Sequence, residues 1–477
     1  MHRKFTKIVA TVGPASESEE MIEKLIRADV NIFRFNFKHN TIEWHADLIR
    51  RVNKVSERIQ TPVGILIDLQ GPGLRINLPS ETMEIKVGDM IPFGTEALAE
   101  KKGFSLTYPE IIADLKEGER LLASDGAFTF YLRRKGAEIF LESASHGILK
   151  QRKSMNIPGV HYPLPILIDR DFEGLKLAQR EAVDFVALSF VRNGEDIKTV
   201  RREMEKYKVD AKIIAKIETK KSIDNLDEII KLSDGIMVAR GDLSVEVPMQ
   251  EVPYYQKLMI KKAITRGIPV ITATQMLESM IENPFPTRAE ISDIANSTYD
   301  LTDAVMLSAE SASGLHPLKA VEVMAATVNF NEKKNVVDSR VRFNFEVNSR
   351  TSVMCDAAYN LYLKLREFDK KDLSGILMFS QTGSSVRLLS RYRPLVPLYA
   401  FVPNHHVRDE LLINYGVVPI AQEDILVSQD VRKEEIVKGV NHLVKQGYVK
   451  KGDLLIALYG DRWAESGGTS TIKIVTV

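Results

Sequence analysis

Cysteine is nearly absent from this chain of 477 residues, and so is a net charge of either sign. The single cysteine, Cys355, excludes a disulfide framework and a metal centre of several thiolates, which is typical of a reducing compartment, so we expect a cytoplasmic protein. The formal net charge is +1, so we expect no nucleic-acid partner and no membrane association. No apolar run approaches the roughly 20 residues of a membrane-spanning helix. A small-molecule partner is the expectation that is left.

Apolar, β-branched strands alternate with amphipathic helices through much of the chain. Continuous apolar strands of this kind favour a parallel sheet covered by helices, and eight such units favour a closed (β/α)8 TIM barrel. An open doubly wound sheet is the alternative, weakened by the missing glycine fingerprint after the first strand. Ser16 is expected to cap the first helix. The eight predicted strands are residues 6–12, 30–37, 63–70, 183–190, 211–218, 235–240, 269–274 and 304–310.

Two interruptions of this pattern divide the chain into three predicted domains. Residues 76–157 contain short alternating runs separated by turn pairs such as Asp125-Gly126, which predict a small inserted β domain that can act as a lid. After a polar linker, the alternation resumes and predicts an open α/β domain of regulatory type over residues 335–477. Residues 1–75 and 158–334 are then the catalytic barrel.

Polar residues stand where the predicted barrel strands end. These ends converge on one mouth, so the side chains are catalytic candidates. For Asn36, Ser189 and Glu310 a purely structural role stays open. The full set is Arg34, Asn36, Asp68, Ser189, Lys216, Glu218, Arg240, Asp242, Thr274 and Glu310.

The residue types at this mouth predict its chemistry. Glu218 and Asp242 come from neighbouring strands and offer hard oxygen ligands, which suit Mg²⁺ or Mn²⁺ rather than zinc. Lys216, Arg34 and Arg75 add positive charge around that metal. The combination suits an anionic substrate, in particular a phosphoryl group in transfer. No Walker loop is present, so a P-loop enzyme is excluded.

Several stretches of the sequence resemble the pyruvate kinase family. The most specific are Ala239-Arg240-Gly241-Asp242, within residues 233–242, and Thr274-Gln275-Met276-Leu277-Glu278, within residues 273–280. Residues 6–16, 34–37, 283–290 and 306–310 extend a similarity that runs the whole length of the chain. The resemblance implies a glycolytic transferase that passes a phosphoryl group from phosphoenolpyruvate to ADP. It also implies a homotetramer.

The resemblance assigns roles residue by residue. Glu218 and Asp242 would hold the divalent metal, and Lys216 with Arg34 would neutralise the phosphoryl group. Backbone amides around Ala239, Arg240 and Gly241 would hold the substrate carboxylate, with Thr274 beside the enolate carbon. Facing the nucleotide would be Asn36, His39, Arg75 and Arg170, where the family usually has lysine at the last position.

The chain departs from the family around a bound potassium ion. Lys38 replaces a serine ligand of that ion, and Leu69, Gln70 and Gly73 replace threonine, lysine and glutamate nearby. An ammonium group and a potassium ion carry the same charge, so they should exclude each other from one small pocket. We therefore expect Lys38, beside Asn36 and Asp68, to replace potassium. The alternative is that Lys38 extends into solvent. Family members without the requirement usually carry lysine at position 73.

The last domain contains a second loop of interest. Ser380, Thr382, Gly383, Ser384 and Ser385 open a helix after a strand, a geometry that binds anions and resembles the family's loop for a sugar-phosphate effector. A plain capped helix start is the alternative.

The departures at Lys38, Leu69, Gln70 and Gly73 keep open a different function for the protein, that of a catalytically lapsed relative that senses a phosphorylated metabolite. The presence of Lys216, Glu218, Asp242 and Thr274 argues against it. Phe285 and Ser244 replace the family's arginine and glycine without an assigned consequence.

Overall fold

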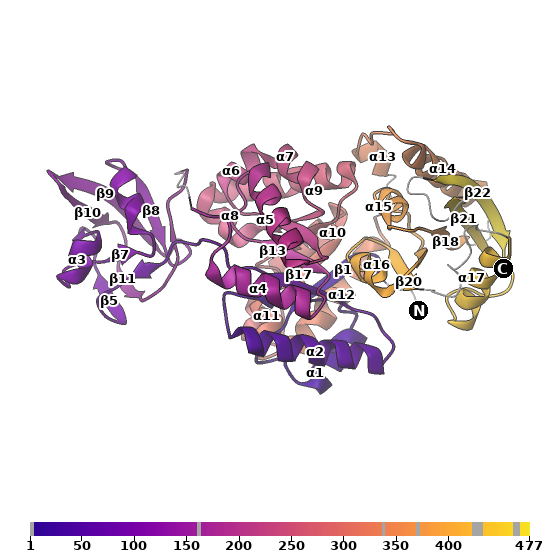
Figure 1. Ribbon diagram of the computed structural model, residues 1–477, viewed down its shortest axis with the longest axis horizontal. Helices are drawn as coiled ribbons and strands as arrows, with labels where there is room; N and C mark the ends of the chain where they lie inside the picture. Colours follow the sequence, from indigo (N-terminus) through magenta and orange to yellow (C-terminus); the bar gives the residue numbers. More distant parts are fainter. Residues whose placement is uncertain (1–3, 160–163, 336–338, 369–372, 422–432, 461–467) are drawn as a thin grey trace.

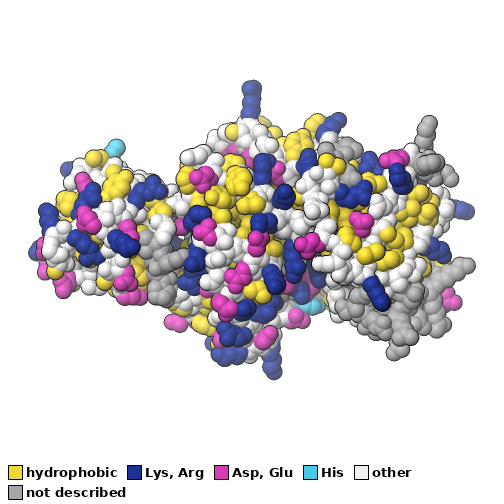
Figure 2. Space-filling view, turned by 90° about the horizontal axis from the view of Figure 1, so that it is seen from above, with side chains coloured by type: hydrophobic (Ala, Val, Ile, Leu, Met, Phe, Trp, Pro, Cys, Tyr) yellow, Lys and Arg dark blue, Asp and Glu magenta, His cyan; other side chains and the backbone are white. Residues whose placement is uncertain are grey.

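The computed structural model describes residues 4–159, 164–335, 339–368, 373–421, 433–460 and 468–477. Three bodies follow one another in space, with the barrel between the inserted β domain and the C-terminal domain (Figure 1). Figure 2 shows basic and acidic side chains intermingled over one face of the molecule. No helix in the described ranges is long and apolar enough to cross a membrane.

Eight parallel strands close into a barrel in the order β1-β17-β16-β15-β14-β13-β3-β2, so the predicted TIM barrel is confirmed. Their side chains are buried on both sides of the sheet, which explains their unbroken apolar character. The strands are β1 (Lys7–Thr11), β2 (Ile32–Asn36), β3 (Gly64–Asp68), β13 (Phe185–Leu188), β14 (Lys212–Ile217), β15 (Gly235–Ala239), β16 (Val270–Ala273) and β17 (Ala304–Leu307).

Helices cover the outside of the barrel (Figure 1). The first helix begins after Ser18, whose side chain accepts a hydrogen bond from the amide of Met21, so the predicted cap at Ser16 is wrong by two residues. The long helices are α1 (Glu19–Arg27), α2 (Ile42–Arg58), α4 (Asp169–Arg180), α5 (Gly194–Tyr207), α9 (Val252–Arg266), α10 (Arg288–Tyr299) and α12 (Pro317–Glu332). Shorter helices are α6 (Lys220–Asp224), α7 (Leu226–Leu232), α8 (Arg240–Glu246), α11 (Ala309–Ala312), η2 (Met249–Glu251) and η3 (Glu278–Ile281).

The insertion after β3 is a small β domain with a core of its own, built around Phe104, Phe130 and Leu141. Antiparallel pairing dominates it, as its turn-separated alternating runs predict. Its elements are β4 (Ile76–Asn77), β5 (Thr82–Ile85), β6 (Met90–Pro92), α3 (Thr95–Ala99), β7 (Ser105–Leu106), η1 (Pro109–Asp114), β8 (Arg120–Ala123), β9 (Phe128–Lys135), β10 (Glu138–Ser143), β11 (Gly147–Lys150) and β12 (Met155–Asn156).

The C-terminal domain is an open sheet in the order β20-β19-β18-β21-β22, in which only β22 runs antiparallel to its neighbour. Its elements are α13 (Ser339–Arg342), α14 (Arg350–Phe368), β18 (Leu373–Phe379), α15 (Ser384–Ser390), β19 (Leu398–Val402), α16 (His405–Glu410), β20 (Val417–Ala421), α17 (Lys433–Lys445), β21 (Leu454–Gly460) and β22 (Thr469–Thr476). Ile413 from this domain belongs to the same apolar cluster as Val9 and Ile32 inside the barrel, so the domain closes the barrel's N-terminal end.

Candidate active site

Lys216 is the centre of the polar cluster at the C-terminal ends of the strands. It lies on β14 with 3% of its surface exposed. Its ammonium donates to Ser189 Oγ at 2.7 Å, and it lies 3.4 Å from Asp68 Oδ1 and 3.2 Å from Glu218 Oε2. Burial alone would lower the pKa of Lys216, but Asp68, Glu218 and Asp242 together raise that pKa well above its usual value. The mouth therefore holds a permanent buried cation.

Arg34 supplies a second cation beside it. Its Nε and Nη2 both donate to Asp68 Oδ2, at 2.8 and 2.6 Å, and Nη1 donates to Thr11 Oγ1 at 2.9 Å. Burial alone would raise the pKa of Asp68, but Lys216, Arg34 and Lys38 outweigh it and lower that pKa. Asp68 is therefore ionised, and it orients both cations toward the mouth.

Glu218 and Asp242 fit a divalent metal. Glu218 Oε1 accepts from the amide of Phe190 at 2.5 Å, whereas Oε2 is buried without a hydrogen-bond partner among the described residues. Burial, opposed by Lys216 and reinforced by Asp242, raises the pKa of Glu218. In the described part of the chain this buried oxygen faces only the Lys216 ammonium, and Asp242 lies close enough to raise the pKa of Glu218, so a bound divalent cation would stabilise both carboxylates.

A cavity of about 130 Å³ adjoins this pair and reaches the junction between the barrel and the inserted domain. Glu218, Asp242 and Glu246 line it from the barrel, and Leu74 and Asn156 line it from that junction. Burial raises the pKa of Glu246 to about 7, although hydrogen bonds from Lys220 and Asn156 oppose that change. The carboxylates of the barrel and the base of the lid thus share one space.

Thr274 ends the neighbouring strand in a strained conformation. Its φ is +65°, a left-handed value that β-branched residues rarely adopt. Its hydroxyl donates to Ala273 O at 2.7 Å and accepts from the amide of Gly241 at 2.8 Å. The strain therefore aims the hydroxyl at the start of α8, where the substrate-binding amides were expected.

Arg240 turns its side chain away from the mouth. Its guanidinium contacts Asp293 Oδ1 at 2.7 Å and Ala273 O at 3.2 Å, and also bonds the carbonyl of Thr274. These contacts fix the end of β16. The side chain of Arg240 therefore stabilises the end of β16, and a role of its backbone in binding the substrate carboxylate stays a prediction of the resemblance.

The three residues with an open structural role differ in their contacts. Ser189 accepts the bond from Lys216 and donates to Leu69 O at 2.9 Å, so it fixes the position of the ammonium. Asn36 Oδ1 accepts from the amide of Lys38 at 3.2 Å. Glu310 accepts from the amides of Leu277 and Ser308, so its carboxylate anchors two loops.

The residues expected on the nucleotide side lie around the loop after β2. Arg170 donates to the carbonyls of Phe37 at 2.6 Å, of His39 at 3.1 Å, and of Asn40. Arg170 therefore fixes the loop. Partial burial, reinforced by the charges of Lys38, Arg34, Arg75 and Arg170, lowers the pKa of His39. This is a positively charged neighbourhood, as an anionic nucleotide would require.

Lys38 is half-buried and faces the mouth. Its ammonium lies 5.7 Å from the centroid of the Phe190 ring, and its charge contributes to lowering the pKa of Asp68. A Cβ at Gly73 would lie 3.1 Å from two atoms of the same ring. Leu69 is buried in the core with only 1% exposed and contributes no oxygen to the pocket. Lys38 and Gly73 therefore both lie beside the Phe190 ring.

The loop of the C-terminal domain starts α15 with Gly383 at a φ of +71°. Ser385 donates its hydroxyl proton to Ser380 Oγ at 3.1 Å. Arg387, one turn into the helix, donates back to Thr382 O at 2.9 Å. Its guanidinium supplies the positive charge that the loop residues themselves lack.

Phe190, Glu246 and Arg387 are neighbours of these sites that the sequence analysis missed. Phe190 directly follows Ser189, but it is apolar, so a search for polar residues at strand ends does not identify it. Glu246 lies one helical turn after Asp242, and Arg387 lies one turn after Gly383, so helical spacing from a motif residue was the usable signal.

The fold and this mouth define a class of protein, a (β/α)8-barrel enzyme with a buried cationic and carboxylate centre. The model for the pyruvate kinase barrel domain matches residues 3–321, and that for the pyruvate kinase alpha/beta domain matches residues 365–475. Pyruvate kinase of Clostridium acetobutylicum is 38% identical and covers 99% of both chains. Pyruvate kinase of Staphylococcus aureus is 37% identical over 98% of this chain and 80% of its own. The chain belongs to the pyruvate kinase family and is a phosphotransferase.

Proposed function

We propose that this enzyme transfers the phosphoryl group of phosphoenolpyruvate to ADP, giving pyruvate and ATP. The single observation that supports this most is the buried ammonium of Lys216, which lies 3.4 Å from Asp68 and 3.2 Å from Glu218. The carboxylate of Asp242 is close enough to act on the pKa of Glu218. Such a centre neutralises the oxygens of a phosphoryl group in transfer. Glu218 and Asp242 would hold Mg²⁺ or Mn²⁺, which when bound supplies further neutralisation of the phosphoryl charge.

The chain's own residues would then divide the work. Lys216 and Arg34 contact the phosphoryl oxygens and neutralise their charge. The amides of Ala239, Arg240 and Gly241 at the start of α8 hold the carboxylate, which requires Gly241 to exchange its present bond to Thr274 Oγ1. Thr274 holds a proton near the enolate carbon once its hydroxyl turns away from the carbonyl of Ala273, to which it now donates.

The nucleotide would bind on the opposite side of the phosphoryl group. Asn36, His39, Arg75 and Arg170 face it, with the loop after β2 held by Arg170. A cytoplasmic homotetramer is part of the same proposal, and the sensor function is the alternative that the following experiment decides.

Replacing Lys216 by methionine tests the proposal. Methionine keeps most of the stem and removes the charge, so kcat for Mg²⁺-dependent pyruvate formation should fall by at least about 100-fold. The matched control is Lys198→Met, on the exposed face of α5, which should leave the rate unchanged. Activity in Lys216→Met equal to that of the control refutes the role of Lys216. A wild-type protein that binds phosphoenolpyruvate without forming pyruvate supports the sensor.

We further propose that the enzyme needs no potassium. The Lys38 ammonium lies over Phe190 and acts on Asp68, in the neighbourhood where relatives hold the ion. A potassium ion beside it would meet a repulsion of order several kcal/mol at low effective dielectric. The inward position of Lys38 argues against the alternative in which it extends into solvent.

Activity with tetramethylammonium as the only monovalent cation tests this second proposal. Tetramethylammonium is too large for a potassium pocket, so the wild-type rate should equal that with potassium. Lys38→Ser, which restores the residue of relatives, should become slow in tetramethylammonium and recover when potassium is added. Lys54→Ser, far from the mouth on α2, should behave as the wild type. A large fall of the wild-type rate without potassium contradicts the proposal, while Lys216→Met still reports on catalysis separately.

A further inference from the structure

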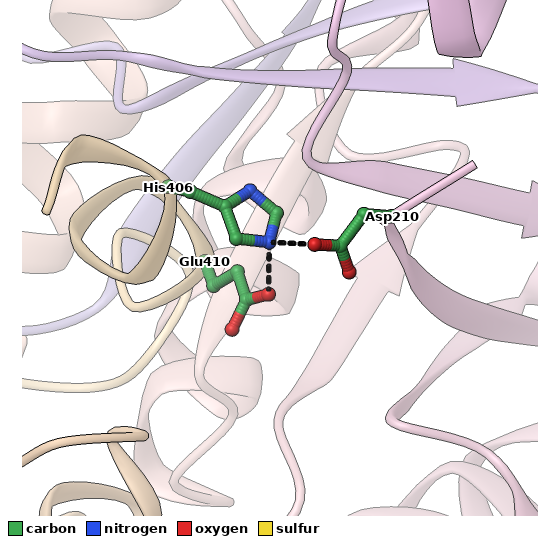
Figure 3. A group of neighbouring side chains, drawn as sticks. All are labelled: Asp210, His406 and Glu410. Atoms are coloured by element: carbon green, nitrogen blue, oxygen red, sulfur yellow. Dashed lines mark ion pairs between the residues drawn. The ribbon is translucent and has the colours of Figure 1, made fainter. Parts of the chain in front are cut away.

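A second group of metal-ligating side chains lies at the opposite end of the barrel, where the loop before β14 meets α16 of the C-terminal domain (Figure 3). His406 Nε2 lies 3.2 Å from Asp210 Oδ2 and 3.0 Å from Glu410 Oε1. The three ligand atoms all lie within 4.8 Å of one another. His406 and Glu410 are four residues apart on one helix and so share a face, while Asp210 comes from the barrel.

The two separations at His406 suit one shared ion, and the third pair of ligand atoms lies within 4.8 Å. Two ligand atoms that are each about 2.1 Å from a metal are roughly 3.0–3.4 Å apart at tetrahedral or octahedral angles. The two separations at His406 fall in that range. A single proton on Nε2 can point at only one of the two carboxylates, whereas an ion between the three atoms serves both. One imidazole with two carboxylates is a ligand set for zinc and similar divalent ions.

Lys212 is the group that competes with such an ion. Its ammonium lies 2.9 Å from the same Glu410 Oε1. About a third of its side chain is exposed, so its flexible stem can move aside into solvent. The side chain of Asp210 is 85% exposed, which leaves room for water to complete the coordination.

We propose that Asp210, His406 and Glu410 form a site for a divalent transition-metal ion, of which zinc is the representative, that ties the barrel to the C-terminal domain. Its ligands come from both domains, so only the docked arrangement presents all three. The ion therefore stabilises the docked, folded chain. This site is separate from the mouth, because Asp210 precedes the strand whose far end carries Lys216 and Glu218.

Zinc binding to the full-length, metal-stripped protein in excess Mg²⁺ tests the proposal. His406→Ala should weaken the binding of a zinc ion by about tenfold or more, and Asp210→Asn should weaken it in the same direction. His405→Ala is the matched control, because this exposed histidine is the preceding residue of the same helix. Zinc that enters the mouth is common to all variants, so the difference between variants reports the junction site.

Two further measurements distinguish zinc binding at the proposed site from nonspecific zinc binding at the surface. Zinc should raise the thermal unfolding midpoint of the wild type and of His405→Ala, but not that of His406→Ala. Lys212→Gln should tighten zinc binding, because it removes the competing ammonium. Equal zinc affinity in the His405 and His406 variants, or weaker binding by Lys212→Gln, overturns the proposal. None of these residues touches the catalytic mouth, so the rate of pyruvate formation is a check that each variant is folded.

Discussion

At the scale of single residues, His45 shows how a buried ring fixes the loop beside the active site. Its ring stacks on Phe37 at 4.4 Å between centroids, and its Nε2 donates to the carbonyl of His39 at 2.9 Å. Its Nδ1 is buried without a partner among the described residues. Burial therefore lowers the pKa of His45 to about 4, although the bond to His39 opposes that change.

This lowered pKa predicts a loss of stability in acid. The folded pKa of about 4 lies below the unfolded value of 6.5, so the unfolded chain takes up the proton first. The contribution of His45 is complete above about pH 6.5 and is lost as the pH falls toward 4, by about 3 kcal/mol in all. The measurement is the free energy of unfolding in urea between pH 7 and pH 4.

His45→Gln removes the titrating group and keeps a donor for the carbonyl of His39. Its free energy of unfolding should vary less with pH over this window than that of the wild type. His405→Gln, at an exposed position of α16, should keep the wild-type slope. Identical slopes for the two variants would show that His45 is not the group responsible.

At the scale of elements, the barrel strands follow directly from the sequence. An unbroken apolar, β-branched run favours a strand in a parallel sheet that is covered on both faces. All eight predicted strands form, and their bounds differ from the prediction only at the ends. The sequence predicts the first helix cap at Ser16, whereas the structure has it at Ser18. Both serines precede a glutamate, so this local pattern does not distinguish them. Ser16 instead closes a turn on Gly13.

Part of the candidate site was also predictable from the strand pattern. Strand ends must meet at one mouth, so Lys216, Glu218 and Asp68 could be grouped without a structure. The direction of each side chain was not available from spacing, because it depends on partners distant in the sequence. The guanidinium of Arg240 binds Asp293, and that of Arg170 binds the loop after β2. Neither partner is implied by a motif.

At the scale of the whole molecule, one helix links the C-terminal loop to the barrel. α15 begins at that loop, and Arg393 follows shortly after its end. Arg393 Nη1 and Nη2 pair with the two carboxylate oxygens of Asp303 at 2.9 and 2.6 Å, just before β17. The amide of Tyr415 also donates to Asp303, at 3.0 Å. A buried pair of this kind holds only while both partners stay in place.

A ligand that moves α15 should therefore affect the barrel. We propose that a sugar phosphate binds the loop of Ser380, Thr382, Gly383, Ser384 and Ser385, where Arg387 supplies a cation. Hexose or pentose phosphates titrated against the saturation curve should shift the curve to lower phosphoenolpyruvate concentrations. Arg387→Met should abolish the shift and leave kcat without the sugar phosphate unchanged, whereas Arg408→Met, on α16, should keep the shift. A wild-type curve that no sugar phosphate moves would instead favour a plain capped helix start at Gly383.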